Sequence, residues 1–60
     1  MRLRELREAT GLSQSDVAKL VGVTVSTVSR WEHGERPTLA HRRKLARVYR
    51  VTLEELGLGD

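Results

Sequence analysis

The residues whose types and spacing could do chemistry are concentrated in the segment 25–33, VSTVSRWEH. In a helix, residues three and four positions apart share a face, so Val28 and Trp31 would form one apolar side. The opposite side then presents Val25, Ser26, Ser29, Arg30 and His33. A short helix with an apolar back, a small polar front and one guanidinium is suited to entering a groove.

No other combination of residues in the chain indicates catalysis or metal binding. The sequence has no Cys to act as a nucleophile or a zinc ligand, and no glycine-rich phosphate loop. Its two histidines, His33 and His41, are eight positions apart and have no third ligand in view. We therefore expect no enzyme, no metal or cofactor site and no small-molecule site.

The residues that precede this polar face have to position it. Apolar residues recur at helical spacing on both sides of Gly22, which would cost one continuous helix about 1 kcal/mol relative to alanine. Three β-branched residues follow Gly22 directly, so two short helices joined by a tight turn explain the pattern better. Ser13 and Asp16 form a variant of the capping box before the first helix, and Thr24 can cap the second. The pattern predicts a helix-turn-helix unit over residues 14–33.

The remaining segments predict further short helices. Residues 1–10 carry leucines at helical spacing and precede a glycine that suits a left-handed stop. Pro37 and Thr38 open another helix. Residues 52–55, TLEE, are a second capping box and predict a last short helix that ends at Gly57. The expected fold class is all-α, a compact bundle of five short helices.

The apolar residues of these helices predict one core, as expected for a single domain of residues 1–60. Trp31 and Tyr49 are the only aromatic residues, and both stand at apolar spacing. We expect them inside the core and not as stacking platforms for single-stranded nucleic acid. The expected core consists of Leu6, Val17, Ala18, Val21, Val28, Trp31, Leu45 and Tyr49.

Positive charge is concentrated in one part of the chain. The net charge is +3, and the segment from Arg36 to Leu53 holds six cations and no acidic residue. Such a segment is either an ordinary solvated helix surface or, where it borders a groove-reading helix, a footprint for phosphate groups. No apolar run is long enough for a membrane span and no Cys is present to form a disulfide, so we expect a cytoplasmic protein without a membrane partner.

Taken together, these residues resemble the Cro-type phage repressor family of helix-turn-helix DNA-binding proteins. The resemblance extends from Leu3 to Leu56. It rests on Gln14 at the first helix of the unit, Ala18 where the two helices approach, Gly22 in the turn, Trp31-Glu32-x-Gly34, and 51-VTLEEL-56. The resemblance implies a lambda-repressor-like DNA-binding domain whose 25–33 helix lies in the major groove.

The resemblance implies base contacts from Val25, Ser26 and Arg30, with Ser29 near them. Arg30 could donate two parallel hydrogen bonds to guanine O6 and N7, a pairing that discriminates bases by roughly 1 to 3 kcal/mol. Val25 could read only a thymine methyl group, and the two serines accept several bases. The alternative for Arg30 and Val25 is an ordinary solvated helix surface.

The resemblance also implies contacts around this helix. Phosphate contacts would come from Gln14, Thr27 and basic side chains around Arg36, and a structural salt bridge would join Arg7 to Glu32. Because Glu35 is acidic, we expect Arg36, Arg42 and Arg43 to supply the basic contacts. Glu35 stands where the family tends to be basic, which weakens phosphate binding by its loop. Arg42 replaces a large apolar residue, so either its stem packs against the core or the start of its helix is looser.

The function that follows is sequence-specific binding of double-stranded DNA by a transcriptional regulator, with repression as the family's commonest mode. The alternative is a protein-binding module with the same fold, such as an antitoxin or a coactivator-like adaptor. The small polar face and the nearby cations favour DNA. We expect a homodimer on a palindromic operator, with residues 53–58, LEELGL, as the best dimer surface. Dimerisation could also be weak, induced by DNA, or supplied by a domain outside these residues.

Overall fold

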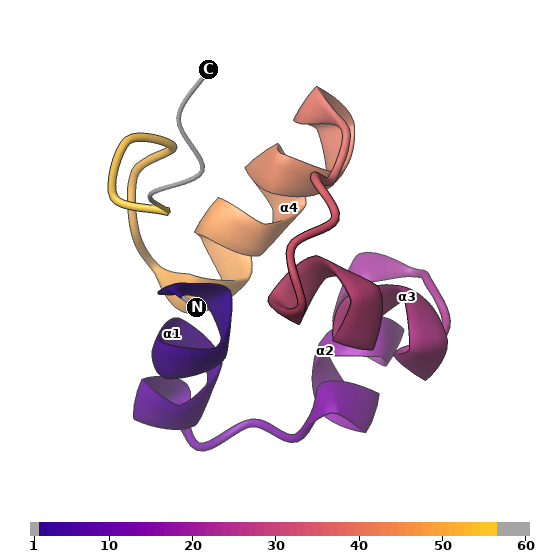
Figure 1. The fold of residues 1–60 in the computed structure, drawn as a ribbon. Coiled ribbons are helices and arrows are strands. Elements are labelled where there is room, and N and C mark those ends of the chain that lie inside the picture. The colour runs from indigo at the N-terminus through magenta and orange to yellow at the C-terminus, as the bar shows by residue number, and fades with distance from the viewer. Residues whose placement is uncertain (1, 57–60) are drawn as a thin grey trace.

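The computed structural model describes residues 2–56, which form four helices and no strand. The helices are α1 (Arg2–Thr10), α2 (Gln14–Val21), α3 (Val25–Glu32) and α4 (Leu39–Tyr49). Both α1 and α2 pack against α3 and α4, so the helices surround a common centre (Figure 1). None of the helices in this part of the chain is long and apolar enough to cross a membrane.

Side-chain caps define where α2 and α3 begin. The amide of Asp16 donates to the Ser13 hydroxyl at 3.0 Å, and the Ser13 amide donates back to the Asp16 carboxylate, which completes the expected capping box. The Thr24 hydroxyl accepts from the amide of Thr27. Between the two helices Gly22 adopts a left-handed φ of 86°, a conformation that is costly for residues with a Cβ. The turn is therefore tight enough to set α3 against α2.

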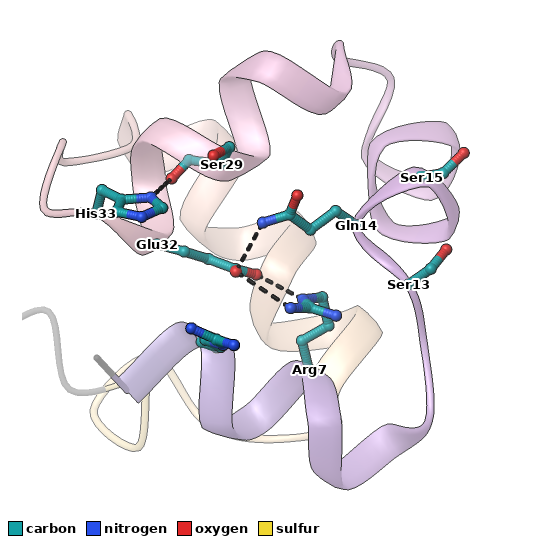
Figure 2. Close-up of a pocket in the computed structure, with 8 residues that line it drawn as sticks. Arg7, Ser13, Gln14, Ser15, Ser29, Glu32 and His33 are labelled. Atoms are coloured by element: carbon teal, nitrogen blue, oxygen red, sulfur yellow. Dashed lines mark hydrogen bonds and ion pairs between the residues drawn. The ribbon is translucent and has the colours of Figure 1, made fainter.

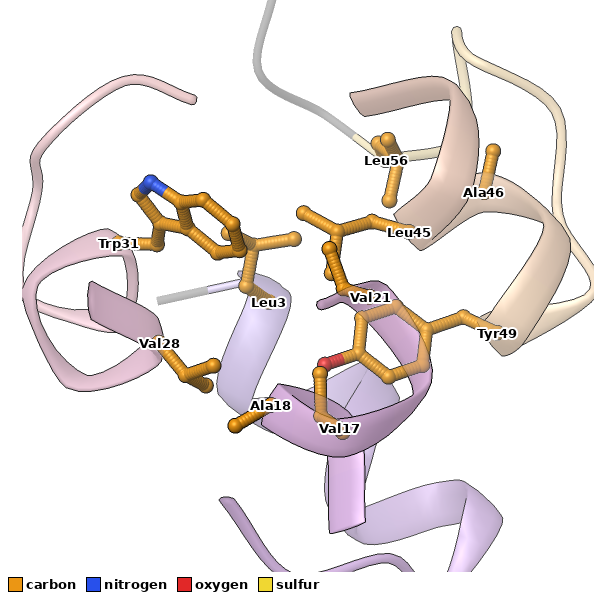
Figure 3. Close-up of a cluster of buried hydrophobic side chains, with 10 residues drawn as sticks. All are labelled: Leu3, Val17, Ala18, Val21, Val28, Trp31, Leu45, Ala46, Tyr49 and Leu56. Carbon is orange, nitrogen blue, oxygen red and sulfur yellow. The ribbon is translucent and has the colours of Figure 1, made fainter. Parts of the chain in front are cut away.

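The buried side chains of all four helices meet in one cluster (Figure 3). It consists of Leu3, Val17, Ala18, Val21, Val28, Trp31, Leu45, Ala46, Tyr49 and Leu56. Leu6, expected in the core, is only partly buried and packs on its edge. Leu6 lies three residues after Leu3 on the same side of α1, at the margin of the buried face and not at its centre.

The prediction of a fifth helix is wrong for the described residues. The capping box at 52–55 does form, because the Glu55 amide donates to the Thr52 hydroxyl and the Glu55 carboxylate accepts from the Thr52 amide. It closes a single turn, in which Leu56 donates to the Thr52 carbonyl at 3.1 Å. One such turn fixes several backbone angles for one hydrogen bond, which is too little to make residues 52–56 a helix. The expected end at Gly57 lies outside the described residues, as does Met1 at the start of the first predicted helix.

This turn also changes the interpretation of the expected dimer surface, residues 53–58. Leu56 is fully buried in the core of its own chain and is not available to a partner, whereas Leu53 is 42% exposed. Residues 57 and 58 lie outside the described part. The short turn therefore serves mainly to bring Leu56 into the core.

Candidate nucleic-acid interface

The α3 helix presents a polar front on an apolar back. Val28 and Trp31 are buried beneath it, while Ser26 and Arg30 are exposed and Val25 is 44% exposed. Ser29, also expected to face bases, is less exposed than these residues and lies toward α1 and the start of α2. The helix ends at Glu32, one residue before the expected end, because His33 serves as its C-cap. Fixing the back of α3 in the core gives its front a defined direction.

Arg30 makes two contacts on the surface, both along the edge of its guanidinium that carries Nε and Nη2. Its Nη2 donates to the Thr27 hydroxyl at 3.4 Å, and that hydroxyl lies 2.9 Å from the Thr24 hydroxyl. Its Nε lies 3.2 Å from the Glu35 carboxylate in an ion pair whose two side chains are 57% and 51% exposed. The specificity residue expected from the sequence is therefore oriented by its neighbours, and its pairing with Glu35 was not expected.

A buried ionic cluster joins α1, α2 and α3 behind this front (Figure 2). The Glu32 carboxylate accepts from Arg7 Nε at 2.7 Å and from Arg7 Nη2 at 3.3 Å. It also accepts from Gln14 Nε2 at 2.9 Å. Arg7 further donates to the Leu12 carbonyl at 3.0 Å, so it fixes the loop after α1 as well. The pair of Arg7 and Glu32 was expected, but the participation of Gln14 was not.

The hydrogen bonds of this cluster determine the charge of its members. Burial alone would raise the pKa of the Glu32 carboxyl, but hydrogen bonds from Arg7 and Gln14 outweigh it and hold that pKa below its usual value. The hydrogen bond to Glu32 in turn raises the pKa of Arg7. Burial, with a smaller contribution from the charge of Glu32, raises the pKa of Tyr49 to about 12. Glu32 and Arg7 therefore remain charged, and Tyr49 neutral, at neutral pH.

An open hollow lies beside the cluster, at the N-terminus of α2. It is about 590 Å³ in volume and is lined by Arg4, Arg7, Ser13, Gln14, Ser15, Ser29, Glu32 and His33. Cations and the first amides of a helix are the groups that attract anions. Gln14, expected to contact phosphate, lies here and uses its amide nitrogen to reach Glu32. Such an amide has two hydrogens, so the second can serve another acceptor.

The other residues expected at phosphates lie in α3, in the loop after it and in α4. Thr27 is partly buried at the start of α3, and Arg36 and Arg43 are exposed after it. Arg42 is partly buried and its Nε atom is enclosed by the protein, as expected for a stem that packs against the core. His41 packs near Trp31, with ring centroids 5.2 Å apart, and no group of potential metal ligands forms within residues 2–56.

Comparison with known proteins gives consistent results. A family model described as helix-turn-helix matches residues 3–56. The chain is 38% identical over 60 residues to an uncharacterized HTH-type transcriptional regulator of Archaeoglobus fulgidus, covering 98% of this chain and 86% of that protein. It is 43% identical over 47 residues to another protein of the same organism, named as an HTH-type transcriptional regulatory protein, covering 78% of this chain and 15% of that protein. The chain thus spans most of one relative and a small part of the other. No solved structure gives a significant match.

Proposed function

The chain belongs to the helix-turn-helix family, and from this premise we propose that it binds double-stranded DNA with sequence specificity and represses transcription. The observation that carries the proposal is the front of α3, which is small, polar and basic at one point, on a back buried in the core. A helix held in this way fits the major groove, which is roughly 12 Å wide.

Direct reading of bases falls to the exposed residues of α3. Arg30 is assigned to guanine, because a guanidinium can donate two parallel hydrogen bonds to O6 and N7. Val25 is assigned to a thymine methyl group, and Ser26 to a base with either a donor or an acceptor. Ser29 contributes at the rim, where it is partly buried. With one strongly discriminating side chain, the expected recognition sequence is short.

Phosphate contacts provide most of the affinity in this proposal. Gln14 donates one amide hydrogen to Glu32 and offers the second to a phosphate oxygen, beside the first amides of α2. Thr27 lies at the start of α3, and Arg36, Arg42 and Arg43 follow it in the chain. Because such contacts release counterions, binding should weaken steeply with salt.

The same proposal includes a homodimer of single-domain subunits, formed on a palindromic operator. Two copies of α3 would enter half-sites roughly 34 to 36 Å apart, one helical turn of DNA. Leu53 is the exposed apolar residue of the 53–56 turn and would contribute to contacts between copies. Occupying the operator would exclude RNA polymerase sterically.

The test is fluorescence anisotropy of a labelled random-sequence duplex at several salt concentrations, followed by selection of tight binders from a random pool. We expect salt-dependent binding and an enriched motif that contains guanine. Arg30→Ala should lose the preference for that guanine, by roughly 1 to 3 kcal/mol. Arg47→Ala removes the same charge from an exposed position on α4. It should weaken binding to every duplex by the same factor. No duplex binding at low salt by the folded chain would overturn the proposal and favour a protein-binding module.

A further inference from the structure

Glu35 is attached to Arg30 at two points, although the helix that carries Arg30 ends three residues before Glu35. The backbone amide of Glu35 donates to the Arg30 carbonyl at 2.9 Å. Its carboxylate lies 3.2 Å from Arg30 Nε. Gly34, with a left-handed φ of 118°, provides the bend that returns the chain toward α3. The loop thus places a negative charge directly beside the guanidinium that is assigned to base reading.

The geometry of this pair leaves part of the guanidinium for DNA. Glu35 contacts Nε and Thr27 accepts from Nη2, so one edge of the guanidinium is restrained and the end formed by Nη1 and the second Nη2 hydrogen is left for a base. A restrained guanidinium loses less side-chain entropy when it meets a base than a freely rotating one. The terminal nitrogens of Arg30 can still be directed at a guanine edge beyond the pair.

The same carboxylate opposes contacts with phosphate. Binding to arbitrary DNA sequence consists almost entirely of cation–phosphate contacts. A carboxylate next to Arg30 neutralises that cation and repels phosphate oxygens. A guanine edge offers neutral acceptors, so it is penalised less than a phosphate group. A protein can discriminate between two DNA sequences by including a group that weakens binding to the sequence it should not bind.

We propose that Glu35 is a specificity-determining residue, which holds Arg30 for a base contact and makes the same guanidinium a poor phosphate ligand. This inference rests on the proposed DNA binding and adds to it a residue that suppresses binding to arbitrary sequence. Glu35 acts through Arg30, so it is a positioning residue.

The experiment compares dissociation constants for the selected duplex and for a shuffled duplex of equal length. The proteins are the wild type, Glu35→Gln, Arg30→Gln, the double variant, and Glu54→Gln as a matched control. Glu54 is exposed on the C-terminal turn, which Figure 1 places across the bundle from α3, and its replacement changes net charge equally.

We expect Glu35→Gln to tighten binding to the shuffled duplex about two- to five-fold, the size expected for losing an exposed ion pair, with a smaller gain on the selected duplex. The dissociation constant for the shuffled duplex divided by that for the selected duplex should therefore fall. In the Arg30→Gln background the gain should shrink to that of Glu54→Gln, because Glu35 then has no guanidinium to hold.

Three results would overturn the inference. Equal gains on both duplexes, or an undiminished gain in the Arg30→Gln background, would mean that Glu35 acts only through net charge. A wild type that binds no duplex would overturn the proposed function itself, and the inference with it. Thermal unfolding of every variant, with Glu35→Ala as a second substitution, establishes that the compared chains are folded.

Discussion

Two ion pairs of arginine with glutamate involve α3, and their surroundings differ strongly. Arg7 and Glu32 lie 2.7 Å apart, with 13% and 3% of their side chains exposed. Arg30 and Glu35 lie 3.2 Å apart and are more than half exposed. Glu32 and Arg30 are only two residues apart in the chain. A helix therefore turns one pair into the protein and the other toward solvent within a single turn.

The difference in burial indicates that the pair of Arg7 and Glu32 contributes to stability, whereas the pair of Arg30 and Glu35 contributes little. In the pair of Arg7 and Glu32, which is largely buried beside an open hollow, water replaces a lost partner only in part, so removing either member leaves a poorly compensated charge. An exposed pair is solvated, and breaking it costs about 0 to 1 kcal/mol. The contact that fixes α1 to α3 supports the fold, whereas the contact of Arg30 with Glu35 lies at the surface, where the terminal nitrogens of Arg30 stay open to a base.

The largest expected effect is the loss of the buried pair. Arg7→Ala would leave Glu32 charged without its two guanidinium hydrogen bonds and the Leu12 carbonyl without its donor. We expect a loss in the free energy of unfolding that approaches the figure of about 3 to 5 kcal/mol for a fully buried pair, which is a large share of what so small a domain has. Chemical denaturation followed by circular dichroism measures it.

Arg4→Ala is the matched control for this prediction. Arg4 lies one turn earlier on α1 and pairs with Glu8 at 3.3 Å, but both side chains are more than half exposed. Its loss should cost less than about 1 kcal/mol. Equal losses for Arg4→Ala and Arg7→Ala would contradict the comparison, because burial would then make no difference.

The second prediction concerns the burial of Tyr49, whose phenol feels the charges of Arg7 and Glu32. Tyr49 has its pKa raised from 10.0 to about 12, chiefly by burial. Because the folded pKa exceeds the unfolded one, stability is retained below pH 10 and falls as pH rises from 10 to 12. The loss should reach about 2 to 3 kcal/mol.

This loss can be measured by denaturation between pH 9 and pH 12. Tyr49→Phe should lack the component that comes from the phenol, since phenylalanine does not ionise. The chain has a single tyrosine, so phenolate absorbance reports Tyr49 alone. An ionisation midpoint near 10 in the folded protein would mean that water reaches the Tyr49 hydroxyl.

The smallest expected effect is that of the exposed pair on folding. Glu35→Gln should change the free energy of unfolding by less than about 1 kcal/mol, because solvent replaces the lost contact. The same variant should lower the selectivity of the protein for its preferred duplex, because Arg30 then lacks its carboxylate partner. A large loss of stability would show that the pair with Arg30 supports the fold, and the distinction between the two pairs would fail.

Local features of the chain were accessible from its sequence. The start of α2 at Gln14 and the turn at Gly22 follow from caps and a left-handed glycine, which act within about four residues. The family resemblance was correct, since the family model matches residues 3–56. The end of α4 was not signalled, because Arg50 adopts a left-handed φ of 58° without being glycine.

The sequence by itself determined helices α1 to α4, most of their apolar sides and the polar front of α3, because these depend on periodicity and on contacts between near neighbours. Only the tertiary structure decided that Leu56 closes the core, that Gln14 joins Arg7 at Glu32, and that Glu35 returns to Arg30. The first two join residues far apart in sequence, and the third depends on the path of the loop after α3. Which groups become neighbours, and whether water reaches them, is set by how the helices pack.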